Sequence, residues 1–436
     1  MLTGSVFKTI LTFSAYNFWG YLVLFIQSLL EVFFVSKLGI EELAALGIVT
    51  SVSLVVSQIG NSFAIAATTF VAKEIKETKN LVTIFVMISF VIGIVFSSLG
   101  FYFKDSILHL LGFFSGKIYD LAYENISINF LSLFFLTVSQ SAAGVLRGLG
   151  FVKVTTVNLT LYGAITYLLT PMLIFGYKTI PAFGFSGVAM STSFGRFCSA
   201  IFILVALFKK DLLIFPWNIK IDFSKMKQFI ILAFVTFSSN LIIPVMASVV
   251  AKSLVPYGKI PVAAYAIMMR LETFFNLVSN AVFTVFIAFL GQNFVNRQMK
   301  RVEESFYYTI IVLFFWFFIP CLGIFIFKKE FLSIFTQDPE VQKYCSFYIQ
   351  FTLPFLYFEA LRFSLGALFN VFNKTHYSFI VIVLKFLAFL LLSKYLERHF
   401  GVHGIFLTLS IIHCIFGFLI FFLGRKVILK IKKENI

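Results

Sequence analysis

The sequence predicts an all-α integral membrane protein. Twelve transmembrane helices are expected in two parallel six-helix repeats, an N-lobe and a C-lobe, around a central cleft. Three observations lead to this fold class. The 436 residues are 60% apolar and only 12% charged, whereas soluble domains carry about 25% charged residues. Long apolar runs follow one another along the chain, whose mean hydropathy is +0.98. A pattern of the first half also returns in the second half.

Each apolar run is long enough to cross about 30 Å of hydrocarbon, which takes about 20 helical residues. The first six runs lie near 10–36, 43–71, 81–103, 121–146, 154–176 and 184–208. The second six lie near 227–255, 262–290, 306–327, 341–370, 376–396 and 402–423. Because the number of spans is even, both ends of the chain are expected on the same side of the membrane.

The internal repeat has a nearly constant offset. Residues 36–47, SKLGIEELAALG, return as residues 255–266, VPYGKIPVAAYA, with Gly39 on Gly258 at an offset of 219. FGFSGVAM at 183–190 reappears as FGVHGIFL at 400–407, at an offset of 217. Six spans per half make the repeats parallel, related by an axis along the membrane normal. Duplicated bundles around a midplane cavity are typical of alternating-access transporters, so the repeat indicates transport.

The expected domains are an N-lobe at 1–208, a cytoplasmic linker at 209–228 and a C-lobe at 229–436. With this topology, 20 of the 35 Lys and Arg residues lie on the side of the termini, 10 on the other side and five within spans. The positive-inside rule then predicts cytoplasmic termini. The net charge of +16 is scattered through short loops, which argues against nucleic-acid binding.

Motifs for enzyme chemistry are missing from the sequence. It contains no P-loop, nucleophile triad, HExxH or zinc-ligand spacing, so we do not expect an enzyme. The four cysteines stand singly, without CxxC or Cys/His spacing, and are interpreted as small core hydrophobes. No metal or cofactor is expected apart from a coupling ion.

Several segments resemble the multidrug and toxic compound extrusion (MATE) family. They are EVFFVSKLG at 31–39, LRGLGFVKVT at 146–155, TPMLIFG at 170–176, YAIMMRLE at 265–272 and GQN at 291–293. The resemblance implies export coupled to protons or sodium, through a cleft between two six-helix lobes of a monomer. It also implies membership of a wider superfamily that includes flippases of lipid-linked oligosaccharides.

The resemblance singles out some residues and leaves others unmatched. Family members usually hold an acidic residue eight positions before the glycine that ends the first span, which is Glu31 here. Many members carry an Asn and an Asp four residues apart on the fifth span, where this chain has Thr166 and Thr170. The family's first-span proline, often connected with helix bending, is absent, since the first proline of this chain is Pro171.

Charged residues within spans are costly and usually face the bundle interior. They are Glu31, Arg196, Lys252, Arg270, Glu272, Glu359, Arg362 and Lys385. Glu31 lies four residues after Gln27, on the same helix face, and has no basic neighbour in sequence. A carboxyl group buried without a cationic partner takes up a proton more readily, as a coupling site requires. The alternative is that Glu31 is solvated at the outer end of its span.

Glu272 and Glu359 are the other candidates for cation or proton coupling. Glu359 and Arg362 are three residues apart, which favours a structural ion pair, although some relatives carry an acid near this position. Arg270 and Glu272 are two residues apart and cannot face each other on a helix. Each is therefore expected to find another partner, and Lys252 and Lys385 are possible counter-charges.

Further polar residues are candidates for lining a cavity. Arg196 and His413 occupy equivalent places in the two repeats, at an offset of 217. The cavity-lining candidates are Gln27, Thr166, Thr170, Arg196, Arg270, Asn276 and His413. The alternative role for such residues is hydrogen bonding between helices.

The favoured function is a secondary active efflux transporter that exchanges protons or sodium for amphipathic, often cationic, organic compounds by alternating access. The alternative is a flippase of an anionic lipid-linked oligosaccharide, which is favoured by five basic against three acidic residues within spans. The expected partners are a small-molecule substrate and membrane lipid, without nucleic acid.

Overall fold

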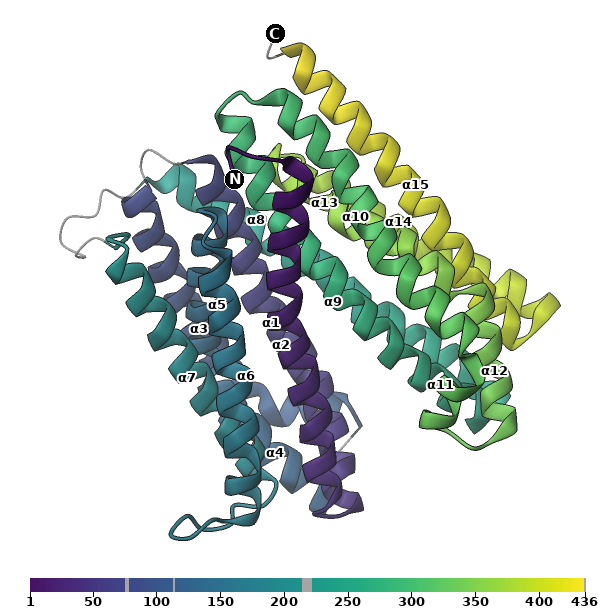
Figure 1. The fold of residues 1–436 in the computed structure, drawn as a ribbon. Coiled ribbons are helices and arrows are strands. Elements are labelled where there is room, and N and C mark those ends of the chain that lie inside the picture. The colour runs from purple at the N-terminus through teal and green to yellow at the C-terminus, as the bar shows by residue number, and fades with distance from the viewer. Residues whose placement is uncertain (75–77, 113, 214–221, 435–436) are drawn as a thin grey trace. The chain divides into compact units, whose positions relative to one another are not determined.

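The computed structural model describes residues 1–74, 78–112, 114–213 and 222–434, and these residues are almost entirely helical (Figure 1). Residues 214–221 of the expected linker 209–228 lie outside the described residues. The helices of the first half are α1 (Val6–Ser36), α2 (Ile40–Lys73), α3 (Thr78–Leu110), α4 (Lys117–Leu131), α5 (Leu133–Gly148), α6 (Val152–Phe175) and α7 (Ser186–Lys209). Those of the second half are α8 (Phe223–Leu254), η2 (Val255–Tyr257), α9 (Lys259–Val295), α10 (Met299–Ile326), α11 (Lys328–Phe335), α12 (Pro339–Phe351), η3 (Leu353–Phe355), α13 (Leu356–Val371), α14 (Thr375–Phe400) and α15 (Val402–Glu434).

Ten helices in the described chain are long and apolar enough to cross a membrane. The pair α4 and α5, bent by 46° at its break, raises the number to as many as 11. The predicted all-helical membrane fold is thereby confirmed. The run expected near 341–370 is divided into α12, η3 and α13, because Pro354 lacks the backbone N–H that a continuous helix needs. Alone, α12 and α13 have only 13 and 16 residues.

The two broken helices occupy matching places in the repeats. Ser132, at the break between α4 and α5, accepts a hydrogen bond of 2.8 Å from the Arg196 guanidinium of α7. In the second half, Thr352 stands between α12 and η3, and the Ser410 hydroxyl of α15 donates to the Phe351 carbonyl at 2.6 Å. A polar side chain of the last long helix in each half therefore satisfies an acceptor at the break.

Glycines with positive φ angles recur at equivalent turns in both halves. Gly39 and Gly258, which precede the second helix of each repeat, have φ angles of 155° and 91°. Gly184 and Gly401, which precede the sixth span of each repeat, have φ angles of 56° and 57°. A residue with a side chain would be strained at these angles, so glycine is required at both ends of the repeated unit.

The chain forms two compact units. The N-unit is Trp19–Phe237, and the C-unit combines Met1–Phe18 with Ser238–Ile436. Both boundaries fall inside a helix, α1 in one case and α8 in the other. They lie 219 residues apart, which is the offset of the internal repeat. The first part of each repeat's first helix therefore belongs to the unit that holds most of the other repeat.

Close helix packing forms the N-unit core. A Cβ atom added at Gly144 of α5 would lie 2.3 Å from the Ala64 carbonyl oxygen of α2. The Thr68 hydroxyl of α2 donates to the Gly144 carbonyl at 3.0 Å. Small residues allow such close backbone approach in membranes. Elsewhere in the unit, Phe229 of α8 stacks on Phe85 of α3, with ring centroids 4.1 Å apart.

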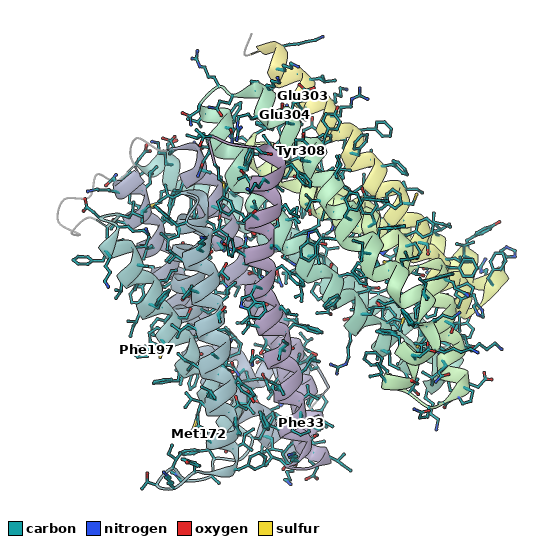
Figure 2. The ribbon with its side chains drawn as sticks, in the orientation of Figure 1. Phe33, Met172, Phe197, Glu303, Glu304 and Tyr308 are labelled. Carbon is teal, nitrogen blue, oxygen red and sulfur yellow. The ribbon has the colours of Figure 1, made fainter. Side chains whose placement is uncertain are left out.

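The helices differ in how far they are buried. In an apolar 18-residue stretch of α9, 78% of the residues are buried, against 11% in such a stretch of α1. Large apolar side chains project from the helices, such as Phe33 of α1 and Phe197 of α7 in Figure 2, which are 52% and 39% exposed. An apolar exterior is expected of helices that contact lipid.

Candidate functional site

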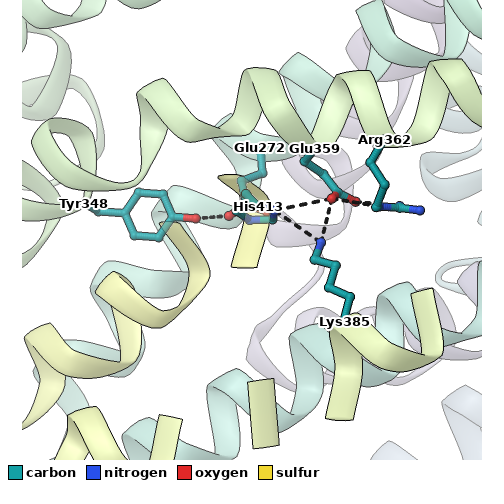
Figure 3. Close-up of polar contacts among 6 residues, drawn as sticks. All are labelled: Glu272, Tyr348, Glu359, Arg362, Lys385 and His413. Atoms are coloured by element: carbon teal, nitrogen blue, oxygen red, sulfur yellow. Dashed lines mark hydrogen bonds and ion pairs between the residues drawn. The ribbon is translucent and has the colours of Figure 1, made fainter. Parts of the chain in front are cut away.

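A cluster of ionisable and polar side chains lies inside the C-unit (Figure 3). We call it the C-unit polar cluster. Its members are Glu272 of α9, Tyr348 of α12, Glu359 and Arg362 of α13, Lys385 of α14, and His413 of α15. Five helices therefore converge on one set of charges.

Glu359 is the centre of this cluster. Arg362 donates to both carboxylate oxygens, from Nε at 2.9 Å and from Nη2 at 2.6 Å. Lys385 Nζ donates to Oε2 at 2.6 Å, and His413 Nδ1 lies 3.3 Å from the same oxygen. The predicted Glu359–Arg362 ion pair is thus confirmed. A coupling ion would have to compete with two cations for these oxygens, so the geometry favours a structural role for Glu359.

Lys385 joins the two carboxylates of the cluster. Its side chain is only 2% exposed, and Nζ lies 3.2 Å from His413 Nδ1 as well as bonding to Glu359. Glu272 interacts electrostatically with Lys385, and its Oε1 accepts a hydrogen bond from the Tyr348 hydroxyl. Lys385 is therefore shared by two acidic groups. Sequence reasoning named it as a possible counter-charge but did not connect it with Glu359.

A second set of polar side chains lies in the N-unit, around Glu31. As the four-residue spacing predicts, Gln27 Nε2 donates to Glu31 Oε2 at 3.0 Å. Glu31 is partly exposed. Arg196 of α7 interacts electrostatically with Glu31 and with Tyr162 of α6. The hydrogen bond to Glu31 thus comes from a neutral amide, while a cation stands nearby without an ion pair to it in the described chain.

Arg196 is 7% exposed and ties α7 to the break between α4 and α5. Its Nη1 donates to the Asn129 carbonyl at 3.1 Å and to the Ser132 hydroxyl at 2.8 Å. Its Nε has no hydrogen-bond partner among the residues that the structure describes. Sequence reasoning did not connect Arg196 with Glu31, because 165 residues separate them. The available signal was that both are intramembrane charges of opposite sign.

Thr166 and Thr170 are buried between α6 and α7. Thr166 donates to the Tyr162 carbonyl at 2.9 Å, and Thr170 donates to the Thr166 carbonyl at 2.7 Å. The Thr170 hydroxyl also lies 2.8 Å from the Ser191 hydroxyl of α7. Of these contacts, the one with Ser191 joins α6 to α7. The cavity-lining role of the two threonines stays a prediction.

Three further candidates are exposed on helices of the C-unit. Arg270 and Asn276 are exposed on α9, and Lys252 is exposed on α8. The Asn276 carbonyl accepts a hydrogen bond of 2.8 Å from Asn280. Arg270 and Glu272 differ in exposure, in keeping with positions two apart on a helix. Whether Arg270 and Asn276 line a cavity stays a prediction.

The family model described as MatE matches this chain over residues 18–172 and 233–396, one segment in each half. Among curated relatives, the FAD transporter of Shewanella oneidensis is 24% identical, covering 98% of this chain and 96% of the relative. The multidrug export protein MepA of Staphylococcus saprophyticus is 21% identical, covering 94% of this chain and 91% of the relative.

Solved structures share the fold over nearly the whole chain. A MATE structure described as being in the straight conformation matches with a TM-score of 0.92 at 18% identity, covering 99% of this chain and 98% of that one. A MOP superfamily transporter from Pyrococcus furiosus matches with a TM-score of 0.90 at 19% identity, covering 98% and 97%. That transporter is described as having a binding pocket of reverse polarity.

Proposed function

This chain belongs to the MATE family of transporters in the MOP superfamily, and from that premise we propose that it exports small organic molecules by proton-coupled alternating access. The family membership makes it a multi-pass membrane transporter and not an enzyme. The proposal adds the coupling ion, its site at Glu31, and an amphipathic, often cationic, cargo.

Glu31 carries the proposal. It is an intramembrane carboxylate whose hydrogen bond comes from the neutral Gln27 amide, and it stands near Arg196. Protonation of Glu31 would remove a negative charge beside Arg196, whose guanidinium holds the α4–α5 break through Ser132. A proton at Glu31 can therefore change the packing of the N-unit, which is what coupling requires. Sodium coupling through Glu359 is disfavoured, because Arg362 and Lys385 occupy that carboxylate.

The test is transport in proteoliposomes with an imposed pH or sodium gradient and ethidium as the probe, comparing the wild type with Glu31→Gln. We expect movement of ethidium under a pH gradient, and its loss in the variant. Glu303→Gln is the matched control. Glu303 pairs with Lys432 at 2.7 Å and belongs neither to the C-unit polar cluster nor to the polar side chains around Glu31. Gradient-driven efflux by Glu31→Gln at the wild-type rate would contradict the assignment of Glu31 as the coupling site. A response to a sodium gradient alone would mean that sodium, and not the proton, is the coupling ion.

A second candidate function is the transport of an anionic, phosphate-bearing cargo, with a lipid-linked oligosaccharide as one example. Once Glu359 and Arg362 are paired, the other charges within spans are Arg196, Lys252, Arg270 and Lys385 against Glu31 and Glu272. A relative covering the chain is named for FAD, a dinucleotide whose phosphates are anionic. Movement of FAD but not ethidium, reduced by Arg270→Gln, would favour this function.

The remaining proposals concern the setting of the transporter. We infer cytoplasmic termini, which are supported by the two-to-one bias of Lys and Arg towards the side of the termini. We also infer a bacterial inner (plasma) membrane, since the relatives reported above come from bacteria. We also propose a monomer that contacts membrane lipid.

A further inference from the structure

The first part of α1 belongs to the C-unit, and its contacts there are specific. Asn17 Nδ2 donates to the Thr284 hydroxyl of α9 at 2.8 Å in a buried position. The ring of Phe7 packs against Tyr308 of α10, with centroids 5.6 Å apart. Tyr308 is labelled in Figure 2, close to the start of the chain. These contacts fix one face of the helix along several turns.

The segment before α1 is held by a side chain from the first turn of α10. Arg301 Nη1 donates to the Gly4 carbonyl at 2.7 Å, and Nη2 donates to the carbonyls of Met1 at 3.2 Å and Thr3 at 3.5 Å. Arg301 Nε donates to Asn293 Oδ1 at 2.9 Å. We call this arrangement the clasp: the Asn293 and Arg301 side chains with the carbonyls of residues 1, 3 and 4.

Asn293 orients the clasp. It is the last residue of the GQN segment and is completely buried. Its Nδ2 donates to the Phe289 carbonyl one turn back at 2.8 Å and to the Met1 carbonyl at 3.4 Å. Its Oδ1 is thereby turned towards Arg301. A guanidinium has five N–H donors in a fixed plane, so it can bond Asn293 and three carbonyls together, whereas a lysine presents a single ammonium group.

Beyond Phe18, α1 passes to the N-unit within one turn. A Cβ atom at Gly20 would lie 3.0 Å from Leu159 of α6. The Tyr21 hydroxyl accepts a hydrogen bond from the Arg147 guanidinium of α5 at 3.3 Å. One continuous helix therefore connects the clasp to the segment that carries Glu31. Any displacement of one unit must be accommodated by α1 or opposed by the clasp.

We propose that the clasp of Asn293 and Arg301 is a releasable latch, which holds the first part of α1 on the C-unit and opens during the transport cycle. The latch is inferred from the hydrogen bonds of Arg301 and Asn293 to the start of the chain. Only its opening during transport rests on the proposed function. The GQN segment thereby gains a physical role, because its Asn293 accepts a hydrogen bond from Arg301 and orients that side chain.

The latch is tested by hydrogen–deuterium exchange on the full-length protein in detergent. In Arg301→Ala and Asn293→Ala, backbone amides of residues 6–12 should exchange at least tenfold faster, while those of residues 24–36 keep their wild-type rates. Arg301→Lys should lie in between. Lys300→Ala is the matched control, because Lys300 is the adjacent exposed cation. Unchanged exchange in residues 6–12 would overturn the latch, as would faster exchange throughout the protein, which would make Arg301 a general stabiliser.

The opening of the latch during transport is tested by cross-linking it in the closed state. With the four native cysteines replaced, Gly4→Cys and Lys300→Cys are joined by a short cross-linker that contains a reducible disulfide. Cross-linked protein should lose ethidium transport and regain it after reduction. Full transport in the cross-linked state would overturn release while leaving the exchange result intact. If protein without the cross-linker moves neither ethidium nor FAD, the proposed function fails instead, and the exchange experiment still decides the latch.

Discussion

The three intramembrane carboxylates differ in what their oxygens contact. Glu359 accepts hydrogen bonds from two cations, whereas Glu272 accepts one from the Tyr348 hydroxyl and Glu31 accepts one from the Gln27 amide. Removing the charge of Glu359 would leave Arg362 without its carboxylate and Lys385 with Glu272 alone. Removing the charge of Glu31 leaves a neutral hydrogen-bonded pair. Chemistry that needs a change of charge therefore fits Glu31 better than Glu359.

At the residue scale, Glu359→Gln should destabilise the protein more than Lys385→Met. The first change removes the partner of the buried Arg362 and one of the two acidic neighbours of Lys385, and a buried ion pair that loses one partner costs about 3–5 kcal/mol. The second keeps the Arg362–Glu359 pair. Thermal unfolding in detergent measures both, with Glu303→Gln at a partly exposed pair as a control expected to cost about 0–1 kcal/mol. A larger loss in Lys385→Met would contradict this ordering.

Sequence spacing predicts contacts within a helix better than contacts between helices. The Gln27–Glu31 and Glu359–Arg362 pairs follow from the helical repeat, because residues three or four apart share a face. Lys385 joins Glu359 from another helix, and no spacing in the sequence could show that. Helix packing decides such neighbours, and packing depends on side-chain shapes along the whole interface.

At the element scale, apolar runs predict where the helices lie but not where they break. The run near 121–146 was expected as one span, and the structure divides it at Ser132. Hydropathy does not respond to backbone angles, so it gave no signal for the bend at Ser132. In the second half, Pro354 gave a local signal for the matching break.

The contact of α2 with α5 should be sensitive to a single methyl group. In Gly144→Ala, the new Cβ would lie 2.3 Å from the backbone oxygen of Ala64, so the helices must separate and strain the hydrogen bond from Thr68. We expect a loss of about 1–3 kcal/mol, seen as a lower melting temperature in detergent. The control is Gly47→Ala in α2, where no atom lies within 4 Å and alanine should be neutral or stabilising. A higher melting temperature for Gly144→Ala would contradict the close packing.

At the scale of the whole molecule, the repeat explains why two helices are shared between the compact units. The boundaries at Phe18 and Phe237 differ by 219, which is the offset of the duplicated segments. The lobe bounds 1–208 and 229–436 stay a prediction of the sequence. Hydropathy could not reveal the exchange of residues 1–18 and 223–237, because equivalent segments of the two repeats have the same apolar character.

This exchange predicts how the chain behaves when it is split between Phe208 and Lys209. The fragment 209–436 lacks Asn17, the partner of Thr284, and the fragment 1–208 lacks Phe229, which stacks on Phe85. Each fragment alone should aggregate in fluorescence-detected gel filtration, whereas the two expressed together should elute as one complex. Replacing 1–208 by 19–208 should weaken that complex, because residues 1–18 complete the C-unit. A monodisperse 209–436 fragment without its partner would show instead that the C-unit folds without residues 1–18.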